Sequence, residues 1–299
     1  MKAKTIRRVL EAKVKDWSGT ITDPAIAKLV TETVIITGGS IASMLLQERI
    51  NDYDVYFKTQ HAAVEVAKYY VAQYVAATNP SIVPEVKVID KRVRIVVKSA
   101  GIAAEGTDDT TYKYFEQLPE DNIESAEYVD PVEVDVEAAV EEDAGVRYRP
   151  VFMSSNAITL SNKVQLIIRF YGSPDEIHEN YDFAHCTSWW SSWDNHLELR
   201  PAAMEALLAR ELRYQGSKYP LCSIIRTRKF IKRGFSVNAG QYLKMCMQLN
   251  ALDLTDVNVL EDQLTGVDVA YFHQVIAYLR DSKKQFDTAY ICEIVDKIF

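Results

Sequence analysis

The chain has 299 residues, with 34 lysines and arginines against 42 aspartates and glutamates, which gives a formal net charge of −8 at pH 7. Hydrophobic residues make up 48% of the chain and charged residues 25%, so wholesale disorder is excluded and about two domains of ordinary size are expected. No window approaches the roughly 18 apolar residues of a membrane span, and no apolar stretch follows the basic N-terminus. We therefore expect a cytoplasmic protein with no membrane partner.

The elements of the N-terminal half are predicted from apolar periodicity and turn residues. They are, in chain order, a helix over 24–33, a strand over 34–36, a turn at 37–40, a helix that starts at Ser40, a strand over 52–57, a helix over 61–77 and a hairpin of strands over 85–89 and 92–98. The Ser40 hydroxyl is expected to cap the first turn of its helix.

Most of the negative charge lies in one segment. Residues 101–145 contain 15 acidic residues and one lysine, a net charge of −14, whereas the rest of the chain sums to +6. The segment is therefore interpreted as an insertion, although residues 132–136 alternate like a strand, and a nucleic-acid partner is not excluded by the overall charge. The insertion is either a solvated segment without a role of its own or a shield over a basic surface.

The second half changes character near residue 200. Strands are expected over 157–160, 164–170 and 180–186, with a short acidic helix before the last of them, and amphipathic helices over 202–214, 224–232, 239–249, 267–279 and 288–299. The prediction is an α+β fold, with a mixed-sheet domain over 1–198 that carries the insertion and an all-helical domain over 199–299 that closes a cleft.

Two aspartates, Asp52 and Asp54, follow the Gly-Gly-Ser turn after eleven residues. On a strand, residues two apart point to the same face, so both carboxylates project together. Two like charges at this distance require a cation between them or a proton on one of them, and oxygen ligands suit Mg²⁺ or Mn²⁺. The backbone N–H groups of the turn lie at a helix N-terminus, which favours a phosphate.

These residues carry a resemblance. Thr37-Gly38-Gly39-Ser40 followed by Asp52-Tyr53-Asp54 resembles the G-G-S and D-x-D signature of the DNA polymerase β-like nucleotidyltransferase superfamily. Residues 156–160, 177–183 and 226–235 are also similar to poorly characterised, often phage-encoded members. The resemblance implies the nucleotidyltransferase fold and transfer of a nucleoside monophosphate from an NTP to a hydroxyl, with release of pyrophosphate, in the host cytoplasm if the gene is a phage gene.

The resemblance also implies roles for single residues. Asp52 and Asp54 would bind one metal and share a second with a third carboxylate, for which Asp182 is preferred over Asp90 and Asp135. The nucleotide would be bound by Gly38, Gly39, Ser40, Arg226, Lys229 and Arg233. An RNA acceptor, such as a tRNA 3′ end, is preferred because of the basic C-terminal helices and the tryptophans near residue 190.

Other interpretations stay open. A zinc site is suggested by His178, Asp182, His185, Cys186 and His196, but their spacing fits no familiar zinc pattern. The tryptophans Trp189, Trp190 and Trp193 are either core residues or a base-stacking surface. The rival functions are a non-catalytic binding or structural protein with this fold and an enzyme that transfers NMP to a protein. The sequence leaves the NTP base, the acceptor and the oligomeric state open.

Overall fold

The computed structural model describes residues 1–80, 83–98, 111–112, 147–254, 256, 259–260 and 263. Its contacts divide the chain into two compact units. The first unit comprises Met1–Glu179 and Cys186–Pro201, and the second comprises Asn180–His185 and the described residues from Ala202 onward. The predicted boundary between residues 198 and 199 stays a prediction.

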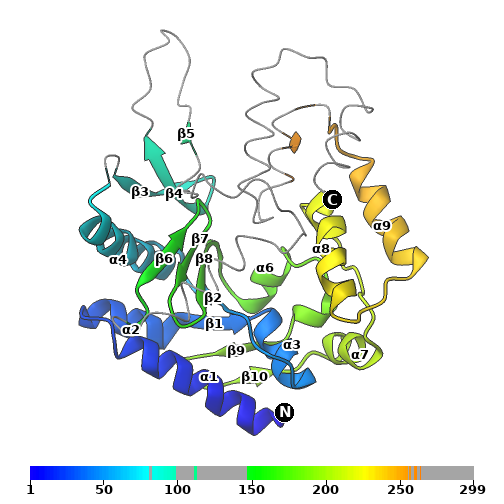
Figure 1. Cartoon of the computed structure of the whole chain (residues 1–299), viewed down its shortest axis with the longest axis horizontal. Coiled ribbons are helices and arrows are strands. Elements are labelled where there is room, and N and C mark those ends of the chain that lie inside the picture. Colours follow the sequence, from blue (N-terminus) through cyan, green and yellow to red (C-terminus); the bar gives the residue numbers. More distant parts are fainter. Residues whose placement is uncertain are drawn as a thin grey trace, which may run out of the picture. The chain divides into compact units, whose positions relative to one another are not determined.

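A seven-stranded mixed sheet forms the centre of the first unit (Figure 1). The strand order is β10-β9-β1-β2-β8-β7-β6, in which β2 and β8 are parallel and the other neighbours antiparallel. The strands are β1 (Val34–Thr37), β2 (Tyr53–Phe57), β6 (Pro150–Met153), β7 (Ala157–Leu160), β8 (Val164–Tyr171), β9 (Trp189–Ser191) and β10 (Leu197–Glu198). The α+β fold class with a mixed sheet is confirmed.

The helices of the first unit are α1 (Ala3–Ser18), α2 (Pro24–Thr33), α3 (Gly39–Leu46), α4 (Gln60–Thr78) and α6 (Pro174–His178). Helix α1 was not predicted, although its buried residues recur at helical spacing: Ile6, Leu10, Val14 and Trp17. In Figure 1, α1, α2 and α4 lie along the sheet, and their apolar residues belong to the same core as the strands.

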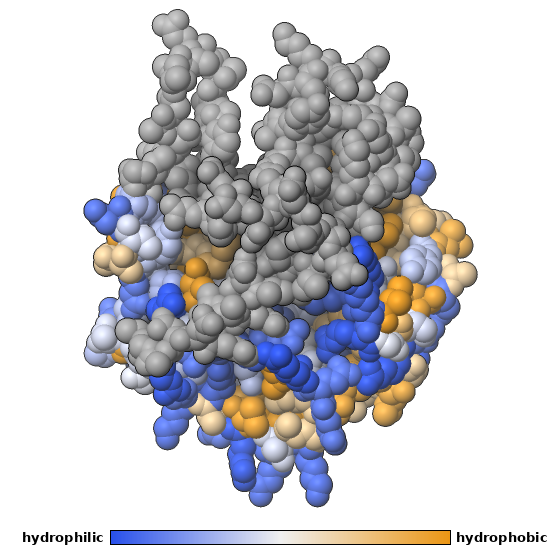
Figure 2. Space-filling model, viewed as in Figure 1, coloured by the Kyte–Doolittle hydropathy of each residue, from blue (hydrophilic) through white to orange (hydrophobic). Residues whose placement is uncertain are grey.

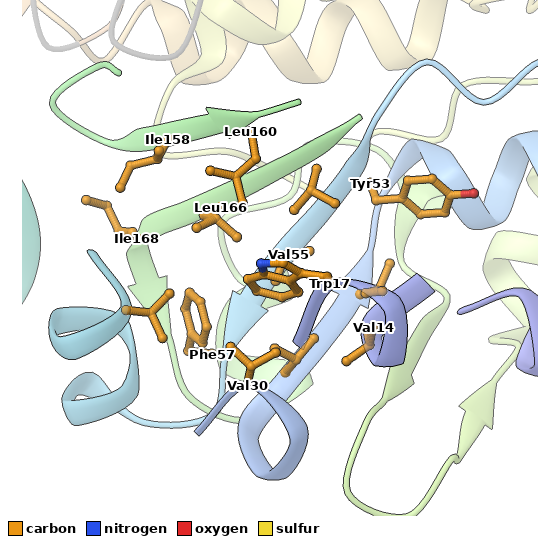
Figure 3. Packing of buried hydrophobic residues seen from close by; sticks show 14 of the residues in the cluster. Val14, Trp17, Val30, Tyr53, Val55, Phe57, Ile158, Leu160, Leu166 and Ile168 are labelled. Carbon is orange, nitrogen blue, oxygen red and sulfur yellow. The ribbon is translucent and has the colours of Figure 1, made fainter. Parts of the chain in front are cut away.

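One face of the sheet forms the core of the first unit. Val55 and Phe57 of β2 are buried with Leu166 of β8, and Figure 3 shows them packed close to Trp17 of α1 and Val30 of α2. Burial of each such side chain contributes about 1.5–3 kcal/mol. Because side chains alternate along a strand, the residues between these core positions belong to the opposite face of the sheet.

A second sheet contains the predicted hairpin. Its strands are β3 (Pro84–Ile89), β4 (Arg92–Lys98) and the short β5 (Thr111–Tyr112). Asp90 and Lys91 form the hairpin turn with φ angles of 49° and 61°, so Asp90 lies at a turn, as the sequence indicated. The predicted strand at 132–136 and its Asp135 lie outside the described residues.

The described C-terminal part of the chain is helical, as predicted. It contains α7 (Pro201–Ala209), α8 (Pro220–Lys232) and α9 (Ala239–Leu249). The first of these ends earlier than the predicted helix over 202–214, because Arg210 has a left-handed φ of 50° and the chain then turns. The helices predicted over 267–279 and 288–299 lie outside the described residues.

The strand predicted over 180–186 is wrong. The segment is a bend followed by a short 3₁₀ turn, η1 (Ala184–Cys186), with one isolated bridge between Phe183 and Tyr214. Its backbone bonds to a neighbouring irregular segment, since Gln215 N donates to Asp182 O and Ala184 N donates to Arg213 O. A run of apolar residues this short is compatible with either conformation, and these tertiary bonds decide it.

Core packing is borne out for one of the three tryptophans. Trp190 on β9 is 1% exposed and belongs to the core, so core packing is confirmed for this residue. Trp193 is half-buried with the Lys58 ammonium 4.5 Å from the centre of its ring. A base-stacking role for Trp189 and Trp193 stays a prediction.

Apolar side chains also occur on the surface. On α9, Leu243 and Met247 are 61% and 68% exposed. Figure 2 shows apolar residues at the surface on the right-hand side of the view. Among the described helices, none combines the length and the apolar character needed to cross a membrane.

Candidate functional site

The turn at residues 38–40, hereafter the 38–40 turn, connects β1 to α3. Gly38 has φ 86° and ψ −148°, a conformation that an L side chain rarely adopts, so glycine is required at this position. Its N–H donates to Cys186 O at 3.1 Å, which fixes the turn against the segment before β9. The N-cap of α3 is Gly38 and no side chain caps the helix, so the expected cap by Ser40 is wrong.

The first turn of α3 carries two features of an anion site. Ser40 is only 1% exposed, yet its buried hydroxyl has no hydrogen-bond partner in the described structure. Gly39 lies beside open space, because a Cβ atom added there would meet no other atom within 4 Å. Unused donors and free space at a helix N-terminus fit a phosphate group.

Thr37, which precedes the 38–40 turn, is held by buried hydrogen bonds. Its hydroxyl lies 2.9 Å from Ser188 O, 3.2 Å from Cys186 O and 2.8 Å from His178 Nε2. A hydroxyl donates once, and the carbonyls can only accept, so the threonine donates to a carbonyl and His178 Nε2–H donates to Thr37 Oγ1. His178, at the end of α6, thereby connects that helix to the end of β1.

The environment keeps His178 neutral. Burial lowers its pKa from 6.5 to about 4, the Arg200 guanidinium adds to the decrease, and Asp175 opposes it. Arg200 and Asp175 also form an ion pair with each other. A neutral imidazole with its proton on Nε2 agrees with the hydrogen bond to Thr37 at neutral pH.

Asp52 and Asp54 lie at the start of β2, which begins one residue later than the predicted strand over 52–57. Asp52 is exposed and directly precedes β2, and Asp54 is half-buried within it. Tyr53 between them is buried in the core, as the alternation predicted. The strand registers place Asp54 opposite Thr37 of β1. The aspartate pair and the 38–40 turn are therefore brought together by one strand pairing.

The donor set fits a hard divalent cation. The carboxylates of Asp52, directly before β2, and Asp54, within it, supply anionic oxygens of the kind that Mg²⁺ and Mn²⁺ prefer. Among the described residues, no three His, Cys, Asp or Glu side chains gather where a metal ion could be bound. The zinc interpretation therefore finds no support among the described residues. Among the same residues, no third acidic ligand lies close to Asp52 and Asp54.

The structure pairs two residues that were predicted to act separately. In the second unit, Arg226 Nη1 donates to Asp182 Oδ2 at 3.0 Å, and Asp182 is 8% exposed. This is the arginine pairing that a buried aspartate commonly requires. Metal binding by Asp182 and phosphate binding by Arg226 stay predictions.

The other predicted cations also belong to the second unit. Lys229 is exposed in the last turn of α8, and Arg233 is the half-buried residue that ends this helix. Arg210 Nη1 donates to Arg233 O at 2.8 Å, which ties the end of α8 to the residue that follows α7. Their contact with a nucleotide stays a prediction.

A cluster of cations around two tyrosines was not predicted from the sequence. The Lys13 ammonium lies 5.0 Å from the ring centre of Tyr53 and 5.2 Å from that of Tyr148. Burial, together with the charges of Arg147 and Lys163, lowers the pKa of Lys13 to about 8. The cluster includes Tyr53, which lies between Asp52 and Asp54 at the start of β2. No local sequence motif predicts it.

A family comparison identifies the chain. A family model described as Gad2, Gabija anti-defense 2 family protein, matches residues 8–210. The chain belongs to the Gad2 family. The matched region includes the 38–40 turn, the aspartate pair and His178. No curated protein matches the chain.

Solved structures resemble this Gad2 protein remotely. The CCA-adding enzyme of Thermotoga maritima complexed with tRNA_CCA shares 14% identity over 84% of this chain and 50% of that chain, with a TM-score of 0.39. The CCA-adding enzyme of Bacillus stearothermophilus in complex with CTP shares 12% identity over 88% of this chain and 49% of that chain, with a TM-score of 0.36. The Gad2 chain thus spans about half the length of these enzymes.

Proposed function

We propose that this Gad2 protein is a metal-dependent nucleotidyltransferase. In the proposed reaction, an acceptor hydroxyl forms a bond to the α-phosphorus of an NTP, the bond from that phosphorus to the bridging oxygen breaks, and pyrophosphate leaves. The hydroxyl proton passes to solvent. The general resemblance of the turn and the aspartate pair to nucleotidyltransferases motivates this reaction class.

The observation that supports the proposal most directly is the register of β1 and β2. Thr37 lies opposite Asp54, and Thr37 leads directly into the 38–40 turn. A turn with unused donors and a pair of carboxylates therefore occur at the same edge of one strand pair. This combination suits a triphosphate accompanied by a divalent cation.

The residues of this chain have separate tasks in the proposal. The N–H groups of Gly39 and Ser40 and the Ser40 hydroxyl bind the terminal phosphates, while the Gly38 N–H stays bonded to Cys186 O. Asp52 and Asp54 hold Mg²⁺ or Mn²⁺, which when bound neutralises phosphate charge and lowers the pKa of an attacking hydroxyl. His178 and Thr37 keep the turn in place. Asp182 as a further ligand, and Arg226, Lys229 and Arg233 as phosphate contacts, rest on the resemblance alone.

The acceptor is proposed to be RNA. The region 201–249 contains nine lysines and arginines against two glutamates, a net charge of +7, which suits a phosphate backbone. Transfer to a protein is the other outcome of the same experiment. Total protein is therefore tested as an acceptor beside total RNA.

The test combines labelling with ligand binding. Wild-type protein with Mg²⁺ and each α-³²P-NTP is expected to label RNA and to release pyrophosphate, whereas Asp52→Asn and Asp54→Asn abolish both. The exposed Glu32→Gln on α2 is the matched control, because it removes a carboxylate remote from β2 in the sequence. Mg-NTP should also raise the unfolding temperature, since a ligand at 100 times its Kd stabilises by about 2.7 kcal/mol. Turnover by both aspartate variants would refute the proposal, and no thermal shift with any NTP would favour the non-catalytic rival.

A further inference from the structure

The strand on the other side of Asp54 carries an amide where a third carboxylate would complete an acidic site. β2 pairs with β8 in parallel, and the register places Asp54 opposite Gln165. Paired residues of neighbouring strands point to the same face, and the strands are about 4.8 Å apart. The buried pairs on either side, Tyr53 with Val164 and Val55 with Leu166, confirm that Asp54 and Gln165 share the face opposite the core.

The sheet supplies no other acidic neighbour. In its seven described strands the acidic residues are Asp54 and Glu198, and Glu198 lies on β10 at the edge of the sheet. Glu198 faces His196, with 3.2 Å between the carboxylate and Nε2. Across β1, β2, β8 and β7, the registers align Asp54 with the neutral, oxygen-bearing side chains of Thr37, Gln165 and Thr159.

Of the two neutral side chains that flank Asp54, Gln165 is the one available to a ligand, and Thr159 lies one strand further away on β7. The Thr37 hydroxyl is occupied by His178 and by backbone carbonyls. The Gln165 side chain is half-buried and makes no hydrogen bond to any residue that the structure describes. A half-buried amide without a partner is unfavourable unless a ligand or water bonds to it, and an amide oxygen is a suitable ligand for Mg²⁺ or Mn²⁺.

We infer that Asp52, Asp54 and the amide oxygen of Gln165 form a site for one divalent cation. This inference rests on the proposed function and specifies its metal site. The two carboxylates balance the charge of one divalent ion. A second ion in the same site would leave an excess of two positive charges there before a nucleotide binds. Gln165 thus limits the free protein to a single ion and leaves any further ion to arrive with the nucleotide.

The inference is tested by Mn²⁺ titration of the purified full chain without nucleotide, with the free ion measured by electron paramagnetic resonance. Subtracting the isotherm of Asp54→Asn removes ions bound by the acidic segment at 101–145. One ion per chain is expected in the difference. Gln165→Glu should bind Mn²⁺ at least about tenfold more tightly, because a third negative charge faces the ion, and Gln165→Leu should bind it several-fold more weakly.

The control is Gln73→Glu on α4, which makes the same chemical change on a helix that covers the core face. If Gln165→Glu and Gln165→Leu behave like Gln73→Glu while Asp54→Asn loses the ion, the inference is overturned and the proposed function stands. Two ions that both depend on Asp54 would also overturn it. If Asp52→Asn and Asp54→Asn both bind Mn²⁺ as the wild type does, the metal site of the proposed function fails together with this inference.

Discussion

The Asp182 carboxylate accepts a hydrogen bond of 3.0 Å from the Arg226 guanidinium, within the second unit of the protein. Both residues carry a predicted role in catalysis, one as a metal ligand and the other as a phosphate contact. Each is now seen to neutralise the other. The hydrogen bond between Asp182 and Arg226 connects the bend at 180–185 to α8. The residue that faces Asp54 on β8 is Gln165 and not Asp182.

The first prediction concerns this pair. Asp182→Asn and Arg226→Met should each lower the free energy of unfolding, and a double-mutant cycle should give a coupling of about 1–2 kcal/mol, as for hydrogen bonds between charged groups. Urea unfolding of the four proteins measures it. A coupling near zero, combined with loss of Mn²⁺ binding in Asp182→Asn alone, would instead favour Asp182 as a metal ligand.

Much of the first unit follows from local sequence signals. The strand, turn, helix and strand around the 38–40 turn and Asp52 are predicted because apolar runs, glycines and alternation act over a few residues. The hairpin around Asp90 is predicted for the same reason. The amphipathic spacing of α1 is a local signal of the same kind, so this helix could also have been predicted from the sequence.

The composition of the site depends on pairings that are distant in sequence. β2 and β8 are separated by about 110 residues, and only their register reveals that Gln165 faces Asp54. A glutamine in an apolar strand carries no signal of its own. The same holds for Thr37 and His178, whose hydrogen bond joins residues 141 positions apart. The bend at 180–185 shows the converse, since backbone bonds to residues 213–215 override a strand-like pattern.

The second prediction separates the two glycines of the turn. Gly39→Ala places a methyl group in open space without backbone strain, so stability should be unchanged while Mg-NTP binding weakens at least tenfold. Gly38→Ala forces a side chain into a φ of 86° and should lower stability by about 1–2 kcal/mol. Thermal unfolding with and without Mg-NTP measures both effects. Normal nucleotide binding by Gly39→Ala would show that the phosphates do not approach this turn.

The third prediction concerns His185, which lies among aromatic rings with Phe230 and Phe235 at centroid distances of 4.5 and 4.8 Å. Neither of its ring nitrogens has a hydrogen-bond partner among the described residues. At pH 7, His185→Leu should therefore leave stability unchanged or raise it, because an apolar side chain replaces unsatisfied polar atoms. A loss of more than about 1 kcal/mol would contradict this.

The same variant should alter the acid limb of the stability profile. Burial lowers the pKa of His185 to about 4, Arg233 adds to the decrease and Asp182 opposes it. Between pH 6.5 and 4 the unfolded chain therefore binds a proton that the folded chain does not, and stability falls as the pH falls. His185→Leu should reduce this loss by roughly 1–3 kcal/mol, whereas the exposed His61→Leu should not change it. Urea unfolding at pH 7 and 4.5 compares the two.

The last prediction concerns Lys13 at alkaline pH. Its pKa is lowered to about 8 by burial and by the charges of Arg147 and Lys163, so between pH 8 and 10 the folded chain has lost a proton that the unfolded chain retains. Stability should therefore rise with pH in this window. Burial raises the pKa of Tyr148 to about 12, so this tyrosine opposes the rise only above pH 10, where the unfolded chain begins to ionise.

Lys13→Met keeps an unbranched apolar stem over the rings of Tyr53 and Tyr148 and removes the charge. The variant should lack the rise in stability between pH 8 and 10, whereas Lys4→Met, on an exposed position of the same helix, should retain it. Thermal unfolding at pH 7, 8, 9 and 10 measures the difference. Equal slopes for wild type and Lys13→Met would show that the ammonium is solvated, and the cation cluster at the start of β2 would then carry no electrostatic strain.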